Sequence, residues 1–237
     1  MNKVLEREWH ARYEAWADRY DADHLISGWS ELGLSRRVTL VVRSIGEAGL
    51  SPSGCFLDLG SGPGVFTRHL KRIGFSCVGL DYSRKVLKVA RRKEKNVSYV
   101  QGEAYNLPFR RQRFMGVICI GVLQSLGSVR LAIQEIQRVI EPGGYVFLDG
   151  LNDLFWLHSL RLHKEGLFRT PKPMSYHNPF YLIEELQALG FGEARLHWLA
   201  MPPRAQRYIE NPIFARTFIA ARVFGYAFLI RMQKISC

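Results

Sequence analysis

The chain has 237 residues, 47% of them hydrophobic, so we expect one domain around a sizeable core. Its four cysteines lie far apart without a CxxC pair, which excludes a disulfide framework and gives no sign of a metal site. A formal net charge of +12 is compatible with a polyanionic partner, such as RNA or an anionic membrane surface, but the clustering of basic residues on one predicted helix means that neither partner is favoured.

The N-terminal residues are rich in charge and lack the apolar core of a signal peptide, so we expect a cytoplasmic protein. The most apolar stretch, residues 213–230, contains Arg216 and Arg222, which are costly at the centre of a bilayer. No transmembrane segment is expected. Residues 213–224 could rest on an anionic membrane surface, but a helix packed on the core is the favoured interpretation.

Residues before Gly49 are predicted to form two amphipathic helices against the core. From Cys55 onward, short apolar runs alternate with helical stretches, the pattern of βα units that build a parallel sheet. The predicted helices cover residues 64–73, 83–93 and 128–140. The predicted strands of this part cover residues 55–60, 77–80, 97–101, 114–120 and 145–148.

After Asp149 the alternation ends. Residues up to 177 are rich in basic and aromatic side chains without a single period, so we assign them to an insertion at the rim of the sheet. Asn178 and Pro179 mark the start of a helix that Gly190 ends. Two further strands are predicted over residues 195–199 and 226–232.

The sequence LDLGSGPG, residues 57–64, carries a predicted strand into a turn with glycines at 60, 62 and 64. Without side chains in the turn, a ligand can approach the backbone and the N-terminus of the following helix. A tight strand-to-helix turn alone rarely needs three glycines. The dinucleotide pattern GxGxxG requires a third glycine where this chain has Val65, so a nicotinamide cofactor is not indicated.

Two carboxylates end the next strands. Asp81 follows the second strand at the same sheet edge as the glycine turn, where it could accept hydrogen bonds from both hydroxyls of a ribose. Glu103 follows the third strand and could accept the amino group of an adenine. Taken alone, Glu103 is more typical of an ordinary loop acid, but its order after the other two motifs favours the nucleoside role.

In this order, LDLGSGPG, LDYS, GEAYNLPF, FMGVICIGVLQSL and IQRVIEPGGYVFLDG resemble the successive motifs of class I S-adenosylmethionine-dependent methyltransferases over residues 55–150. The resemblance implies a Rossmann-like three-layer α/β sandwich with a mostly parallel seven-stranded sheet and an antiparallel last strand. It implies S-adenosylmethionine as the cofactor. The implied cofactor-binding residues are Asp58, Gly60, Ser61, Gly62 and Gly64 at the amino-acid end, Asp81 at the ribose, Tyr82, Glu103 and Ala104 at the adenine, and Tyr20 from the N-terminal segment.

Within the superfamily, the chain is most similar to small-molecule C- and O-methyltransferases, including those of ubiquinone and menaquinone biosynthesis. Their N-terminal segment often ends in Tyr-Asp, matched here by Tyr20 and Asp21, and would close over the cofactor as a lid. Simple packing of this aromatic segment on the core is an equal alternative. The resemblance implies one domain over residues 1–237, with a helical lid (1–49), a cofactor-binding core (50–150), the rim insertion (151–177), and C-terminal helices and strands (178–237).

The general base is left unassigned, because Gln124 and Ser125 stand where many relatives have a histidine. Tyr20 and three histidines are the weak catalytic candidates. A metal is not required, since alignment of a nucleophile with the methyl group can supply on the order of 7 to 11 kcal/mol. The histidines are His158, His163 and His177, and the apolar residues expected to line an acceptor pocket are Phe155, Trp156, Leu157, Leu160 and Phe168.

The sequence thus predicts transfer of a methyl group to an oxygen or carbon of a small, apolar or quinone-like acceptor. No Asn-Pro-Pro-Tyr signature follows the fourth strand, which counts against methylation of DNA. The cluster of basic residues from Arg84 to Lys95 is interpreted as a solvated helix face. An RNA methyltransferase and a non-catalytic cofactor-binding protein stay open as alternatives.

Overall fold

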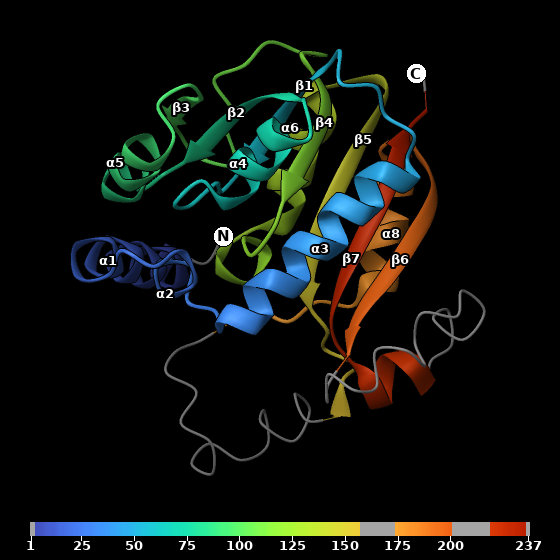
Figure 1. The fold of residues 1–237 in the computed structure, drawn as a ribbon. Coiled ribbons are helices and arrows are strands. Elements are labelled where there is room, and N and C mark those ends of the chain that lie inside the picture. Colours follow the sequence, from blue (N-terminus) through green and yellow to red (C-terminus); the bar gives the residue numbers. More distant parts are fainter. Residues whose placement is uncertain (1–2, 157–173, 201–218, 236–237) are drawn as a thin grey trace.

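The computed structural model describes residues 3–156, 174–200 and 219–235 (Figure 1). Seven strands form one sheet in the order β3-β2-β1-β4-β5-β7-β6. The first five strands in chain order are parallel, and β7 is antiparallel to both β5 and β6. The strands are β1 (Cys55–Leu59), β2 (Ser76–Asp81), β3 (Ser98–Gln101), β4 (Phe114–Cys119), β5 (Ile140–Leu151), β6 (Phe191–Ala200) and β7 (Gly225–Lys234).

Helices cover both faces of this sheet, so the molecule has three layers (Figure 1). On one face, α3 and α4 pack their apolar residues against Phe56 and Phe147. On the other face, α6 and α8 pack against Leu57 and Leu148. The helices are α1 (Lys3–Arg19), α2 (Asp23–Ile26), α3 (Glu31–Glu47), α4 (Val65–Arg72), α5 (Arg84–Lys93), α6 (Val129–Val139) and α8 (Pro179–Ala188), with a short 3-10 helix η1 (Leu123–Ser125) and a π-helix η3 (Ala220–Phe224).

Phe56 of β1 points into one core and Leu57 into the other. Because a strand between two helical layers is buried on both faces, β1 is a nearly continuous apolar run in the sequence. The fold implied by the family resemblance is confirmed. Each strand and helix predicted after Cys55 is present where the chain is described, with small shifts at its ends.

Three elements differ from the prediction. The N-terminal part contains three helices rather than two, because Ser30 begins α3 by accepting a hydrogen bond from the amide of Gly33, 3.0 Å away. Strand β5 is longer than predicted, since Ile140 is already extended and pairs with Phe114. Strand β6 begins at Phe191, directly after helix α8 and its terminal turn.

The last strand also fixes helices of both layers. Arg231 donates to the carbonyl oxygen of Ser44 at the C-terminal end of α3, 2.7 Å away. Lys234 donates to the carbonyl oxygens of Gln137 and Ile140 at the C-terminal end of α6, each 2.8 Å away. Carbonyl groups at a helix C-terminus lack partners within the helix, and cationic side chains satisfy them.

Most of the predicted rim insertion, with residues 157–173, lies outside the described part of the chain. The same holds for residues 213–218 of the stretch considered for a membrane surface; its described end leads through η3 into β7. Within the described ranges, no helix is both long and apolar enough to cross a membrane.

Candidate active site

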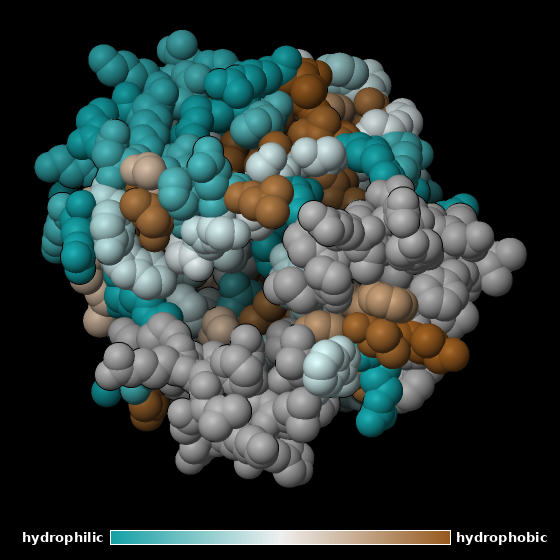
Figure 2. Space-filling model, turned by 60° about the horizontal axis from the view of Figure 1, so that its bottom comes forward, coloured by the Kyte–Doolittle hydropathy of each residue, from teal (hydrophilic) through white to brown (hydrophobic). Residues whose placement is uncertain are grey.

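A cleft of about 710 Å³ opens at the carboxyl edge of the sheet, over the ends of β1 to β4. Figure 2 brings this edge forward and shows the surface hollowed near its centre. The strand order reverses at β1, which has β2 on one side and β4 on the other. Open α/β sheets bind ligands at such a reversal, outside the carboxyl ends of the strands. The position of the cleft therefore agrees with the general rule.

The three glycines of the turn after β1 have different roles. All three have positive φ angles, 72° at Gly60, 52° at Gly62 and 81° at Gly64. A Cβ atom on Gly60 would lie 2.3 Å from the side chain of Val122, and one on Gly64 would lie 2.4 Å from the hydroxyl of Tyr99. A Cβ atom on Gly62 would meet no atom within 4 Å. Packing therefore requires Gly60 and Gly64, and Gly62 faces the open cleft.

The Asp81 carboxylate lies at the end of β2 and is 7% exposed. Its two oxygens accept hydrogen bonds from the backbone amides of Gly62 and Ser83, each 2.9 Å away. Burial raises the pKa of Asp81, and these two amides lower it. Each carboxylate oxygen can accept a second hydrogen bond, so Asp81 holds the glycine turn and still offers acceptors to a ligand.

Asp58 lies beneath the turn and does not line the cleft. One of its oxygens accepts from the amide of Thr67 at 3.0 Å, which ties the first turn of α4 to β1. Burial raises the pKa of Asp58 to about 8. The sequence resemblance implied contact with the cofactor, but the described contact of Asp58 is with helix α4.

Two buried hydroxyls in the cleft wall, those of Ser61 and Tyr82, have no hydrogen-bond partner among the described residues. A buried polar group without a partner costs about 1 to 3 kcal/mol, so these hydroxyls favour a ligand with hydrogen-bonding groups. Glu103 and Ala104 line the same cleft beyond the end of β3. The predicted adenine-binding residues are thus brought to one wall.

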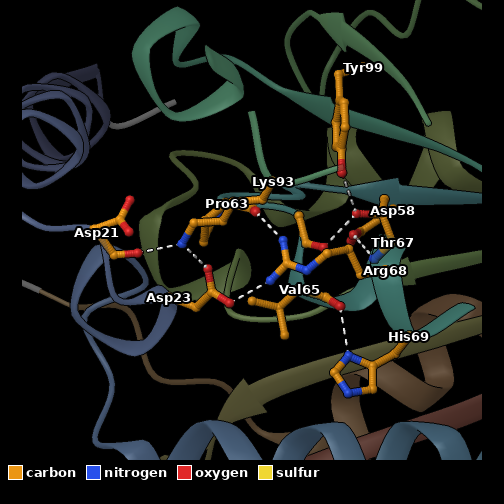
Figure 3. Close-up of polar contacts among 11 residues, drawn as sticks. Asp21, Asp23, Asp58, Pro63, Val65, Thr67, Arg68, His69, Lys93 and Tyr99 are labelled. Atoms are coloured by element: carbon orange, nitrogen blue, oxygen red, sulfur yellow. Dashed lines mark hydrogen bonds and ion pairs between the residues drawn. The ribbon is translucent and has the colours of Figure 1, made fainter. Parts of the chain in front are cut away.

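Residues of the N-terminal segment line the cleft, and Figure 3 shows the ion pairs that hold Asp23 of this segment. Asp23 pairs with Arg68 of α4, and its other oxygen lies 2.7 Å from Nζ of Lys93. Arg68 also donates to the carbonyl oxygen of Pro63 in the glycine turn, 2.7 Å away. Asp23 is therefore linked through one side chain to the turn that forms the floor of the cleft.

Helix α1 adds further ion pairs to the basic helix α5. Lys85 lies 2.5 Å from the Asp18 carboxylate, and Arg92 pairs with Asp21. The basic residues of α5 were predicted to form a solvated face, and all but Lys93 are exposed. Lys85, Arg92 and the partly buried Lys93 also pair with acids more than 60 positions away, which was not predicted. Part of the positive charge in the sequence is therefore matched within the molecule.

One face of α1 lines the cleft with Glu6, His10 and Tyr13, whose spacing of four and three residues matches one side of a helix. The ring of His10 lies 4.8 Å from that of Tyr82, measured between centroids. Tyr20 does not line the cleft and packs beside Val86 in a separate apolar cluster. Within the N-terminal aromatic segment, Tyr13 therefore lines the cleft while Tyr20 packs on the core.

Of the predicted catalytic and pocket residues, those that the structure describes do not line this cleft. His177 lies at a smaller cavity, with its Nε2 atom 3.2 Å from the carbonyl oxygen of Leu123, and burial lowers its pKa. Phe155 is buried in the core and Trp156 is exposed; neither lines the cleft. His158, His163, Leu157, Leu160 and Phe168 lie outside the described residues. Sequence reasoning missed Trp29, which lines the cleft.

Comparison with known proteins identifies a methyltransferase domain. A model of this domain matches residues 57–148, which include the glycine turn, Asp81 and Glu103. The chain is an S-adenosylmethionine-dependent methyltransferase, similar to enzymes of menaquinone biosynthesis. This methyltransferase is 26% identical to a demethylmenaquinone methyltransferase of Renibacterium salmoninarum over 80% of its own length and 81% of the relative. It is 33% identical to one of Lactococcus lactis, over 62% and 59% of the two chains.

Solved structures agree with this methyltransferase in fold. A magnesium protoporphyrin IX methyltransferase from Synechocystis, with bound S-adenosylhomocysteine, has a TM-score of 0.66 at 18% identity, covering 86% of this chain and 84% of that one. A methyltransferase from Methanosarcina mazei has a TM-score of 0.61 at 22% identity, covering 78% and 94%. S-adenosylmethionine is the cofactor of the enzyme. The unpaired hydroxyls of Ser61 and Tyr82 and the available acceptors of Asp81 fit such a nucleoside.

Proposed function

We propose that the enzyme transfers the methyl group of S-adenosylmethionine to an oxygen or carbon of a small, apolar, quinol-like acceptor. The observation that carries this proposal is the apolar half of the cleft. Beyond the glycine turn, toward β4, the cleft is lined by Trp29, Val65, Phe66 and Ile120, which belong to one apolar cluster. The similarity to demethylmenaquinone methyltransferases supports the same class of acceptor.

The order of the strands supports one orientation of the cofactor. Its adenine would lie by Glu103, Ala104 and Tyr82, at the ends of β3 and β2, and its ribose by Asp81. The amino-acid part would then lie over Gly62 and Ser61 at the end of β1. The reacting methyl group would then face the apolar half of the cleft, toward β4.

S-adenosylmethionine supplies an electrophilic methyl group on a sulfonium. The protein's task is to hold the acceptor atom in line with it and to exclude water, which is the contribution of the apolar walls and of the covering helix α1. The described residues of the apolar half include no histidine and no charged side chain. An acceptor with an electron-rich ring, such as a quinol, fits this wall because its ring carbon can attack the methyl group before it loses its proton, which is then released to solvent.

The direct test uses S-adenosylmethionine with a reduced 1,4-naphthoquinone that carries a short isoprenoid chain. We expect a product heavier by one methyl group, found by mass spectrometry, with fragmentation assigning the methyl to ring carbon or oxygen. The oxidised quinone, which is not a nucleophile, is the control. Methyl transfer to RNA but not to the quinol would favour the alternative function, and binding of S-adenosylhomocysteine without turnover of either would favour a non-catalytic protein.

We propose that residues 1–237 act as one domain, with the segments 1–49, 50–150, 151–177 and 178–237 as lid, cofactor core, rim and C-terminal completion. Support comes from β6 and β7, which follow the rim segment and pair within the same sheet as β5. Removing them would leave β5 as an unpaired apolar edge. A chain ending at Gly150 should therefore be insoluble, and a cooperatively folding fragment of that length would refute the proposal.

A further inference from the structure

The indole of Trp29 lies directly on the backbone at the end of β4. A Cβ atom added to Gly121 would be 2.2 Å from Cζ2 of Trp29, so only a glycine permits this contact. Trp29 is half-buried, packs against the apolar core beneath α3 and α4, and lines the cleft with the rest of its surface. An aromatic wall therefore stands at the β4 end of the cleft.

A buried ion pair fixes the position of this wall. The guanidinium of Arg37 lies 4.7 Å over the Trp29 ring, and its Nε atom is 3.0 Å from the Asp149 carboxylate. The second oxygen of Asp149 accepts the amide of Gly121, 2.6 Å away. Arg37 is 6% exposed and Asp149 2%, so water competes little for these contacts. These contacts link Trp29 to Arg37, Arg37 to Asp149, Asp149 to Gly121, and Gly121 back to Trp29.

The place of Trp29 along the sheet edge separates it from the cofactor. The proposed cofactor residues follow β3, β2 and β1, which are consecutive in the sheet. Gly121 and Asp149 belong to the ends of β4 and β5, the next two strands on the opposite side of β1. A cofactor that spans β3 to β1 ends before this wall, so the wall faces the molecule that receives the methyl group.

We propose that Trp29 is the residue that binds the aromatic ring of the acceptor and determines its plane, with the Arg37–Asp149 pair as the positioning group behind it. This inference rests on the quinol-like acceptor of the proposed function. An indole suits a flat, electron-rich ring because it offers a large apolar surface and loses little conformational freedom. An aliphatic acceptor would gain much less from it.

The experiment compares Trp29→Phe and Trp29→Ala with Leu32→Ala, a nearby apolar residue that is exposed and outside the cleft. Calorimetry measures binding of S-adenosylhomocysteine, and then binding of the oxidised isoprenyl naphthoquinone to that complex, which cannot react. We expect Trp29→Ala to weaken naphthoquinone binding and to raise the KM of the quinol by roughly tenfold, with Trp29→Phe between it and wild type. Binding of S-adenosylhomocysteine should stay within about threefold in every variant, which also shows that each is folded.

The outcomes separate this inference from the proposed function. Suppose that the wild type binds the naphthoquinone and methylates the quinol, and that Trp29→Ala keeps the Kd of the naphthoquinone and the KM of the quinol within about twofold. The role of Trp29 is then overturned, and the acceptor class stands. If the wild type neither binds the naphthoquinone nor methylates the quinol, the acceptor class fails, and the inference fails with it. A loss of S-adenosylhomocysteine binding in a folded Trp29→Phe variant would place Trp29 at the cofactor instead and would also overturn it.

Discussion

Replacing Asp81 with asparagine tests where the cofactor lies. A hydrogen bond to a charged acceptor is worth about 1.5 to 3 kcal/mol and a neutral one about 0.5 to 1.5, so the change costs about 1 kcal/mol per ribose bond. For two bonds, the Kd of S-adenosylhomocysteine should rise roughly thirtyfold. Alanine is a poorer choice, because Asp81 also accepts the amides of Gly62 and Ser83 and its removal would release the glycine turn.

The introduced asparagine would face one of those two amides with its own NH₂ group, since an amide side chain has only one acceptor oxygen. The protein without ligand should therefore lose about 1 to 3 kcal/mol of stability in Asp81→Asn, and its Tm should fall by several degrees. Calorimetry below this Tm measures the Kd of the folded protein. The matched control is Glu193→Gln on the distant strand β6, which should change neither quantity. A Kd within about threefold of wild type in Asp81→Asn would mean that Asp81 does not hold the ribose.

Three further predictions concern the groups around the cleft and the last strand. Burial raises the pKa of Asp58 to about 8 from its ordinary 3.8, so the folded protein keeps a proton that the unfolded chain releases. This proton's contribution to the free energy of unfolding is full below about pH 4 and is lost as the pH rises to about 8. Urea unfolding should therefore show that wild type loses stability relative to Asp58→Asn between these two pH values. If the free energies of unfolding of the two proteins change in parallel with pH, the assigned pKa is contradicted. Asp23→Asn should speed dissociation of S-adenosylhomocysteine in stopped flow, because it removes the ion pairs that hold α2 to Arg68 and Lys93. Salt should speed wild type more than the variant, which keeps the exposed pairs of Asp18 with Lys85 and of Asp21 with Arg92. An unchanged rate would show that the pairs of Asp23 do not limit dissociation. Lys234→Met should lower the free energy of unfolding by about 2 kcal/mol, because two carbonyls at the end of α6 lose their donor. Gln233→Met, at an exposed position, is the control and should not have this effect. Equal losses of stability in the two variants would refute the capping role of Lys234.

The sequence predicted the elements from Cys55 onward because their signals are local. Apolar runs, the capping residue Ser83 and the glycines after β1 each act within a few positions, and Ser83 does accept the amide of Val86, 3.2 Å away. The pairing of β7 between β5 and β6 was not predictable from such local signals; the family resemblance implied only an antiparallel last strand. Strand β5 was predicted too short, since its first residue, Ile140, is held by Phe114, far earlier in the chain.

The site was predictable to the extent that its residues follow strands. Asp81, Tyr82, Glu103 and Ala104 line the cleft because parallel strands end at one edge. Trp29 carries no such signal, since its position depends on Gly121 and Arg37, and Gly121 is distant from it in the sequence. The ion pairs between α1 and α5 were missed for the same reason: complementary charges are visible in a sequence, but the approach of two distant helices is not.

The strand that carries Arg231 and Lys234 is the last of the seven to be synthesised, and this sets the order in which the enzyme can fold on the ribosome. Before β7 emerges, β5 has an open edge, β6 has no neighbour, and the ends of α3 and α6 lack the donors that close them. The glycine turn and the first five strands can assemble earlier, but only as an incomplete sheet in which the apolar strand β5 is an unpaired edge. The sheet that carries the cleft is thus completed by β7, none of whose residues lines the cleft.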